Sequence, residues 1–204
     1  MTRLVVGPGI TLFKALASDE VLLAALAVLE ACPPRRMMTP GGKSMSVAMT
    51  NCGPLGWVTD RDGYRYVAED PLTGQPWPAM PAPMALLATE AAAAAGFPGF
   101  VPEACLVNLY DIESRMGAHQ DRDEQDRAAP IVSVSFGLAA RFRIGGTSRG
   151  GMTRSFLLEH GDVLVFGGPA RLAYHGVDRI LPGRHSVLGE RRLNLTFRRV
   201  NEAR

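Results

Sequence analysis

Two histidines and an aspartate carry the first indication of chemistry in this sequence. His119 and Asp121 stand two positions apart, and His175 follows much further along the chain. In an extended segment, side chains two positions apart project to the same side, so an imidazole and a carboxylate would face one way. A second imidazole from a distant strand would complete two nitrogens and one oxygen on one face of a metal. That set leaves the opposite face open and suits non-haem iron(II) that handles O₂. Because a His-x-Asp tripeptide also recurs by chance in surface turns, the rest of the chain must support this interpretation.

The segment 192–198 predicts a strand with one apolar face and one polar face. Alternation separates three apolar side chains from four polar ones (Leu193, Leu195 and Phe197 against Arg192, Asn194, Thr196 and Arg198). The two arginines would lie roughly 20 Å apart along a strand, at about 3.3 Å per residue. Because a guanidinium matches a carboxylate with two parallel hydrogen bonds, the pair could flank a small dicarboxylate. An amphipathic edge strand with a solvated polar face is the structural alternative.

A second polar pair, Asn108 and Tyr110, precedes the His-x-Asp tripeptide. The two residues would share one face of a strand over 104–110, with Leu109 on the other. An amide and a phenol could hydrogen-bond an organic acid held in the mouth of a barrel. A tyrosine at a strand end and an asparagine in a turn are the ordinary alternative.

The predicted elements divide the chain near residue 96. Before this point we expect a helix over 21–30 with Ser18 as its N-cap, a strand over 44–50, an aromatic-rich loop or hairpin segment over 51–83, and an alanine-rich helix over 83–95. After it, turns rich in glycine and proline separate short strands over 104–110, 131–138, 141–144, 155–158, 163–166, 172–175 and 193–198. This pattern predicts an α+β, mostly β fold with a sandwich or jelly-roll core. Residues 1–96 would supply helices and a lid, and residues 97–204 the β-core of one compact unit.

The composition is that of an ordinary globular protein of one domain. The 204 residues are 47% apolar and 21% charged, and the formal net charge of +2 is too small to indicate a nucleic-acid partner by itself. Three cysteines without a Cys-x-x-Cys spacing indicate neither a disulfide framework nor a structural zinc site. The sequence shows no signal peptide and no membrane span, so we expect a cytoplasmic protein without a membrane partner.

Six segments together resemble one known family. They lie at 37–42, 45–53, 55–57, 119–124, 174–176 and 192–198, and the likeness extends in order from about residue 37 to residue 199. They are similar to the bacterial AlkB family of iron(II)- and 2-oxoglutarate-dependent dioxygenases, which remove alkyl groups from nucleobases. The resemblance implies a double-stranded β-helix (jelly-roll) core in 97–204, with N-terminal helices and a nucleotide-recognition lid in 1–96.

The resemblance also implies roles for individual residues. His119, Asp121 and His175 would be the catalytic iron ligands. The 2-oxoglutarate site would consist of Asn108, Tyr110, Arg192, Asn194 and Arg198. Trp57 would stack on an extruded base, with Asp123 facing the base edge and Glu124 beside it, and the backbone or rim contacts would be Thr39, Tyr64, Arg122 and Arg149. The chain departs from the family pattern at Phe166, where a tryptophan is expected, and at Arg191, where a neutral residue is expected.

The implied reaction is oxidative demethylation of bases such as 1-methyladenine and 3-methylcytosine, with Fe(II), 2-oxoglutarate and O₂ consumed and formaldehyde and succinate released. The base must leave its stack to reach the metal. Four arginines and no acid lie between residues 139 and 158, which indicates a modest phosphate-binding rim for single-stranded or locally opened DNA, with RNA as a second substrate. We expect a monomer. Two other hypotheses remain: a 2-oxoglutarate-dependent hydroxylase of a protein or small molecule, and a non-catalytic cupin-like binding module.

Overall fold

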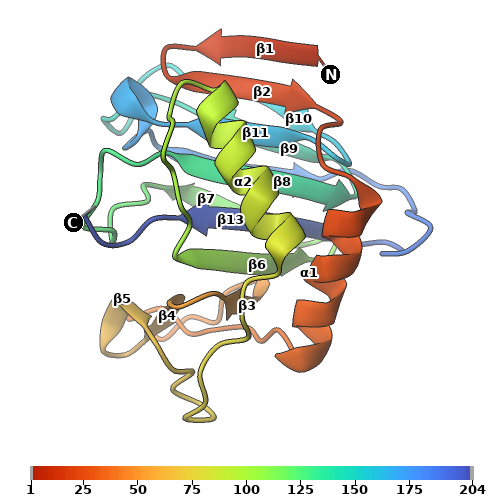
Figure 1. The fold of residues 1–204 in the computed structure, drawn as a ribbon, viewed down its shortest axis with the longest axis vertical. Coiled ribbons are helices and arrows are strands. Elements are labelled where there is room, and N and C mark those ends of the chain that lie inside the picture. The colour runs from red at the N-terminus through yellow and green to blue at the C-terminus, as the bar shows by residue number, and fades with distance from the viewer. Residues whose placement is uncertain (1, 203–204) are drawn as a thin grey trace.

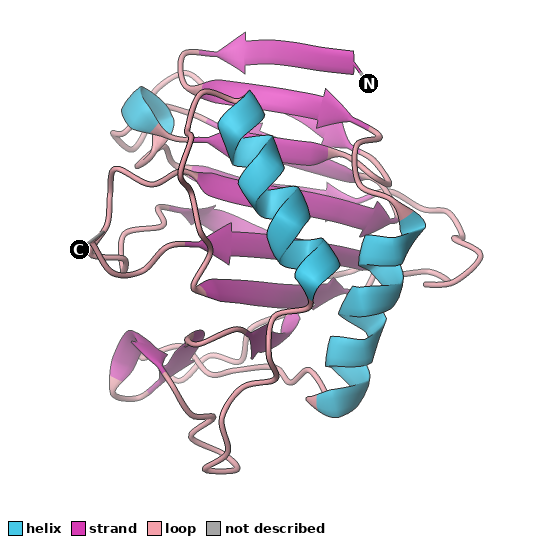
Figure 2. Cartoon of the chain, viewed as in Figure 1, coloured by secondary structure: helices cyan, strands magenta, loops and turns pink. Residues whose placement is uncertain are grey.

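Two antiparallel β-sheets face each other, and two helices cover the outer face of the larger sheet (Figures 1 and 2). The computed structural model describes residues 2–202. The strands are β1 (Thr2–Gly7), β2 (Ile10–Lys14), β3 (Ala48–Cys52), β4 (Gly56–Asp60), β5 (Gly63–Val67), β6 (Ala104–Tyr110), β7 (Met116–His119), β8 (Ile131–Gly137), β9 (Ala140–Ile144), β10 (Arg154–Leu158), β11 (Val163–Phe166), β12 (His175–Ile180) and β13 (Arg192–Arg198). The helices are α1 (Asp19–Ala31), α2 (Ala82–Ala94) and the short 3₁₀ helix η1 (Gly168–Ala170).

The large sheet has the strand order β1-β2-β11-β8-β13-β6-β3, and the small sheet has the order β10-β9-β12-β7. The strand β13 therefore lies near the middle of the large sheet, between β8 and β6, and every one of its residues is buried. The edge-strand alternative for this segment is wrong. The hairpin β4–β5 forms a separate two-stranded sheet and lies beside β3, to its left in Figure 1.

Strand alternation divides the apolar core into two layers. The apolar face of β13 packs with the helices in one cluster that includes Leu195, Leu22 and Met84. The second layer fills the space between the sheets and includes Phe142 and Phe166. Because successive side chains of a strand point to opposite faces, burying Leu193, Leu195 and Phe197 under the helices turns the polar side chains of β13 toward the other sheet.

Both predicted helices are present at nearly the expected positions. Ser18 occupies the N-cap position of α1, although its side chain makes no capping hydrogen bond, and two prolines follow the end of that helix. The helix α2 has proline in its first turn and is followed by Gly96, whose φ of 97° suits glycine.

The structure corrects several predicted strands. β1 and β2 were not expected, yet β2 pairs with β11 and extends the large sheet. With β3 they place three sheet strands before residue 96, where we expected helices, a lid and the single strand at 44–50. β7 was also missed. The prediction for 172–175 is wrong because η1 and a turn occupy the region after Gly167, so that β12 begins only at His175.

None of the helices within residues 2–202 combines the length and the apolar character needed to cross a membrane.

Candidate active site

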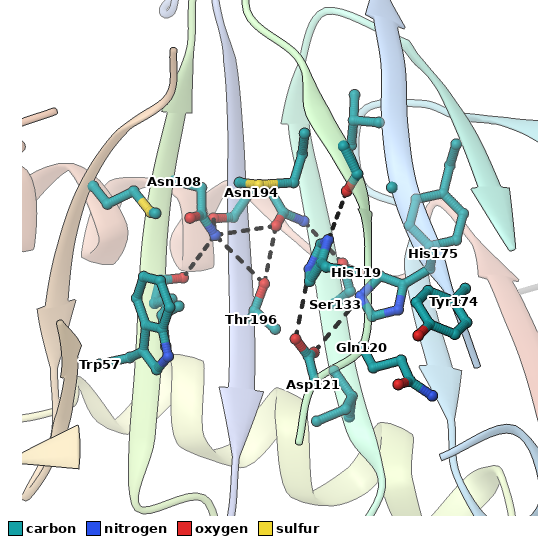
Figure 3. A pocket seen from close by; sticks show the side chains of 18 of the residues that line it. Trp57, Asn108, His119, Gln120, Asp121, Ser133, Tyr174, His175, Asn194 and Thr196 are labelled. Atoms are coloured by element: carbon teal, nitrogen blue, oxygen red, sulfur yellow. Dashed lines mark hydrogen bonds and ion pairs between the residues drawn. The ribbon is translucent and has the colours of Figure 1, made fainter. Parts of the chain in front are cut away.

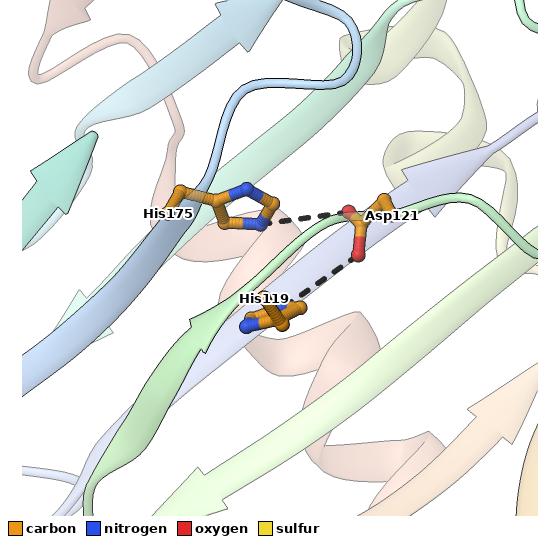
Figure 4. A group of neighbouring side chains, drawn as sticks. All are labelled: His119, Asp121 and His175. Carbon is orange, nitrogen blue, oxygen red and sulfur yellow. Dashed lines mark ion pairs between the residues drawn. The ribbon is translucent and has the colours of Figure 1, made fainter. Parts of the chain in front are cut away.

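His119 and His175 are brought together by strand pairing in the small sheet. Their Cα atoms are register partners between β7 and β12, and the centroids of the two rings lie 4.4 Å apart. Asp121 follows β7 by two residues and turns its carboxylate toward both rings (Figure 4). Nε2 of His119 lies 3.6 Å from Oδ1 of Asp121, and Nε2 of His175 lies 3.7 Å from Oδ2. The possible ligand atoms of all three residues lie within 4.8 Å of one another.

Hydrogen bonds to the backbone assign the protonation of both rings. Nδ1 of His119 lies 2.8 Å from the carbonyl oxygen of Gly117, and Nδ1 of His175 lies 2.9 Å from that of Ala173. A carbonyl oxygen only accepts, so each Nδ1 carries a proton, and in its neutral form each ring keeps a lone pair on Nε2. Both lone pairs face the Asp121 carboxylate, whose buried Oδ2 has no hydrogen-bond donor within residues 2–202. Three facing acceptors fit a cation between them.

The charge states agree with this arrangement. Burial raises the pKa of Asp121, but attraction to the positive charge of Arg198 outweighs burial and holds this pKa well below its usual value. Burial lowers the pKa of His175 to about 4, so its imidazole is neutral near pH 7. A carboxylate and a neutral imidazole are the forms that bind metal.

The polar face of β13 forms the second part of the site. In the register between β13 and β6, Arg192 is the partner of Tyr110 and Asn194 is the partner of Asn108. Asn108 and Asn194 lie side by side in Figure 3. All of the residues predicted to bind 2-oxoglutarate line one cavity of about 390 Å³ together with the histidines and Asp121 (Asn108, Tyr110, Arg192, Asn194, Arg198).

The Asn108 amide nitrogen is loosely held, at 3.4 to 3.5 Å from each of its four acceptors. By contrast, the Asn194 amide donates two hydrogen bonds of 2.9 Å, one of them to the Ser133 hydroxyl. Ser133 lines the cavity and was missed at the level of sequence. The alternation of Ser133 and Ser135 in the strand over 131–138 was a usable signal, because it places two hydroxyls on one face.

Arg192 is a buried cation that makes no ion pair with a carboxylate in the described part of the chain. It is 1% exposed and donates to the Ser135 hydroxyl at 2.7 Å and to two backbone carbonyls at 3.4 Å. Its Nε has no partner within residues 2–202. Burial lowers the pKa of Arg192 to about 10, and burial also raises the pKa of the neighbouring Tyr110 to about 12. A buried guanidinium of this kind fits an anionic ligand.

Arg198, at the other end of β13, is already paired with acids. Its Nη2 lies 2.8 Å from Asp121 and its Nε lies 3.2 Å from Glu124. Burial lowers the pKa of Arg198, but the opposite effect of Asp121 and the other acidic neighbours is larger, so this pKa lies well above its usual value. The two arginines therefore differ: Arg192 forms no ion pair within residues 2–202, whereas Arg198 pairs with the predicted metal ligand Asp121.

The mouth of the cavity carries most of the residues predicted to contact the substrate. Trp57 stacks on Tyr64 with ring centroids 5.6 Å apart, and its indole nitrogen donates to Asp123 at 2.8 Å. Arg122 lines the same mouth, and Arg149 lies over the ring of Tyr174, 5.3 Å from its centroid. Two predicted contacts are not among the lining residues in the part of the chain described (Thr39, Glu124). Thr39 is half-buried, and Glu124 is buried.

Glu124 is instead the centre of a buried polar cluster. Its carboxylate accepts from the Tyr66 hydroxyl at 2.5 Å and from Arg171 at 3.0 Å, in addition to its ion pair with Arg198. Sequence analysis missed Tyr66 and Arg171. The spacing of the β4–β5 hairpin could have paired Tyr66 with Trp57, but the local sequence gives no signal for Arg171.

The two departures from the family pattern lie in different places. Phe166 is buried and meets His175 edge-on, with centroids 4.9 Å apart at 60°, so it shapes the wall behind the metal ligands. Arg191 is exposed, and its carbonyl accepts from the Leu138 amide at 3.0 Å.

Comparisons with known proteins agree with this geometry. The model of the 2OG-Fe(II) oxygenase superfamily matches residues 9–198. The alpha-ketoglutarate-dependent dioxygenase AlkB of Salmonella typhimurium is 54% identical over 170 residues, 83% of this chain and 79% of the relative. AlkB of Escherichia coli is 50% identical over 186 residues, 91% of this chain and 86% of the relative. The solved structure of OsALKBH1 superposes with a TM-score of 0.82 at 29% identity, covering 97% of this chain and 99% of that one.

Proposed function

The chain belongs to the 2OG-Fe(II) oxygenase superfamily, and from this premise we propose that it removes methyl groups oxidatively from N-alkylated nucleobases in DNA. It is a 2-oxoglutarate-dependent dioxygenase that uses Fe(II). The observation that supports a nucleobase as substrate is the aromatic platform formed by Trp57 and Tyr64. This platform lies at the mouth of the same cavity that holds the His-Asp-His cluster.

In this proposal His119, Asp121 and His175 hold the iron. Strand pairing fixes both imidazoles, and the Nδ1 hydrogen bonds orient both Nε2 lone pairs toward one point. Arg198 stabilises the carboxylate form of Asp121. A ligand set of two nitrogens and one oxygen leaves positions free for co-substrate and O₂.

Arg192 and Tyr110 would bind the distal carboxylate of 2-oxoglutarate. The reason is electrostatic: Arg192 is buried without an ion-pair partner among the described residues, and Tyr110 lies directly beside it in register. Asn108, Asn194 and Arg198 would contact the end nearer the metal. The weakly held Asn108 amide has donors to spare for this purpose.

Bound iron, O₂ and 2-oxoglutarate together supply the oxidant that hydroxylates the methyl carbon, with 2-oxoglutarate converted to succinate and CO₂. The hydroxymethyl group is then lost as formaldehyde. The contribution of the protein is to orient the C–H bond and to exclude water, and Phe166 and Phe142 form apolar walls beside His175 for that purpose.

Trp57 would stack on the flipped base and Asp123 would face its edge. A stacked base is worth about 1–3 kcal/mol, which offsets part of the cost of extrusion. The carboxylate of Asp123 favours a cationic base, as 1-methyladenine and 3-methylcytosine are near neutral pH. Tyr64, Arg122 and Arg149 would contact the backbone at the rim, whereas Thr39 would be reached only by a longer strand.

We extend the proposal to architecture and substrate form. The sandwich would be a double-stranded β-helix, with a recognition lid in 1–96 and the catalytic core in 97–204. Single-stranded or locally opened DNA is the proposed substrate, with RNA second. A single chain would suffice, because the metal cluster, the β13 polar face and the aromatic platform all come from one chain. The cytoplasmic location stays a prediction.

The test incubates the protein with Fe(II), ascorbate, 2-oxoglutarate and a single-stranded oligonucleotide carrying 1-methyladenine or 3-methylcytosine. We expect a methyl-to-hydrogen mass loss in the oligonucleotide that Asp121→Ala abolishes. Succinate formation with every oligonucleotide unchanged would indicate a protein or small-molecule hydroxylase instead. Failure to bind Fe(II) would indicate a non-catalytic binding module.

A further inference from the structure

The β4–β5 hairpin is fastened to the metal-binding loop by two neighbouring residues. Trp57 and Tyr66 are direct register partners across the hairpin. Their side chains donate to the consecutive acids Asp123 and Glu124, at 2.8 and 2.5 Å. Two neighbouring residues of the hairpin are therefore hydrogen-bonded to two consecutive residues of the metal-binding loop. Trp57 belongs to the proposed base site, whereas Tyr66 is not among the described residues that line the cavity.

The Tyr66 hydroxyl connects the hairpin to the proposed co-substrate anchor. It donates to Glu124 and accepts from Nη1 of Arg198 at 2.9 Å. Burial raises the pKa of Tyr66 well above its usual value, so the hydroxyl keeps the proton that it donates. The same Arg198 guanidinium contacts Asp121 through Nη2. One phenol thus joins the aromatic platform to an arginine that lies against the metal cluster and lines the proposed 2-oxoglutarate site.

We propose that Tyr66 is a positioning residue through which binding of 2-oxoglutarate and binding of the methylated strand strengthen each other. This inference rests on the proposed function. An anion beside Arg198 competes for its N–H groups and so sets the position of that guanidinium. Because the Tyr66 hydroxyl is hydrogen-bonded to Arg198, a shift of the guanidinium also shifts the hairpin that carries Trp57. Coupling between two binding sites is reciprocal, so a strand stacked on Trp57 tightens 2-oxoglutarate binding by the same factor.

Other hydrogen bonds keep the hairpin folded when this one is removed. The Asn51 side chain pairs with the backbone of Trp57 through two bonds of 3.0 Å, and the Trp77 indole donates to the Val67 carbonyl at 3.0 Å. These bonds fasten both strands of the hairpin without touching Arg198. Tyr66→Phe therefore removes the link while keeping the ring and the fold.

The experiment measures 2-oxoglutarate affinity by calorimetry in protein loaded with Mn(II) under anaerobic conditions, with and without a saturating single-stranded oligonucleotide that carries 1-methyladenine. The ratio of the two dissociation constants is the coupling factor. We expect a factor of about five or more in the wild type and a factor near one in Tyr66→Phe. With Fe(II) and O₂, Tyr66→Phe should also form more succinate per methyl group removed.

Arg65→Met is the matched control. Arg65 precedes Tyr66 on the same strand, is not among the residues that line the cavity in the part of the chain described, and donates two hydrogen bonds of 2.8 Å to Asp60 within the hairpin. The coupling factor of this variant should therefore equal that of the wild type. A wild-type factor of one, or an equal factor in folded Tyr66→Phe, overturns the inference while leaving the proposed function intact if the wild type still demethylates. If the wild type leaves the methylated oligonucleotide unchanged, the proposed function and the inference both fall.

Discussion

At the scale of single residues, Arg192 has the least compensated charge of the site. The guanidinium is buried, its hydrogen-bond acceptors are neutral, and its Nε has no partner in the part of the chain described. An isolated buried charge is costly, and an anionic ligand that supplies two hydrogen bonds offsets this cost. The stability of the protein should therefore respond strongly to 2-oxoglutarate, and Arg192 should be the reason.

We predict that Arg192→Met abolishes this response. A ligand present at 100 times its dissociation constant stabilises the native state by about 2.7 kcal/mol. In protein loaded with Mn(II), the wild type should show a clear rise in Tm with 2-oxoglutarate, whereas Arg192→Met should show almost none. Differential scanning calorimetry measures both. The neighbouring exposed Arg191, changed to Met, is the control and should keep the full rise. An undiminished rise in Arg192→Met would remove this residue from the co-substrate site.

At the scale of elements, the metal-binding loop and the loop before His175 are held together by Arg171. This side chain is 2% exposed and donates to the Asp121 carbonyl at 2.6 Å, to the Ala129 carbonyl at 2.9 Å and to the Glu124 carboxylate at 3.0 Å. Gln120 adds a second link, since its amide donates to the Leu172 carbonyl at 2.6 Å. The two segments that carry the metal ligands thus owe their separation to side chains as well as to strand pairing.

We predict that Arg171→Met lowers both stability and metal affinity. Removing one partner of a buried ion pair costs about 3–5 kcal/mol, and the lost anchor lets Asp121 move relative to His175. Urea unfolding measures the stability, and calorimetric titration with Mn(II) measures the metal affinity. Arg179→Met, an exposed arginine on β12, is the control and should change stability by less than about 0.5 kcal/mol. Wild-type affinity for Mn(II) in Arg171→Met would show that strand pairing alone sets the cluster.

The same elements show what the sequence could and could not predict. The strand β13 and its two faces follow from alternation, because a side-chain period of two directly separates Leu195 from Asn194. The strands β1 and β2 are short apolar runs, and only their pairing with β11 makes them part of the sheet. Glu124 was expected to contact the substrate, but it is a buried residue that binds Tyr66 and Arg171. These two partners lie 58 and 47 positions away in the sequence. Contacts of that range leave no trace in local pattern.

At the scale of the whole molecule, carboxylates connect segments that strand pairing does not hold. Asp70 pairs with Arg35 and so fastens the loop after β5 to the segment before β3. Glu103 accepts from the backbone of Val200 and Asn201, each at 2.7 Å, at the end of the described chain. Asp126 accepts from Ala129 and from Arg199, which ties the loop after the metal ligands to the same end. The segments around the β4–β5 hairpin and the segments at the C-terminal end of the described chain therefore both depend on ionised acids.

This dependence predicts a defined loss of stability in acid. Burial raises the pKa of Asp70, Glu103 and Asp126, but the opposite effect of their hydrogen bonds and arginine neighbours is larger. Each folded pKa therefore lies below the unfolded value of about 4. The unfolded chain then binds more protons, and the stabilisation is complete above about pH 4 and is lost as pH falls through the folded pKa values.

Urea unfolding of the metal-free protein between pH 2 and pH 6 should show this decline in stability. The double variant Glu103→Gln/Asp126→Asn should be less stable at pH 6, and its stability should decline less steeply. Glu90→Gln, which removes an exposed carboxylate from α2, is the control for loss of charge alone. An equally steep decline in the double variant would place the acid sensitivity elsewhere in the molecule.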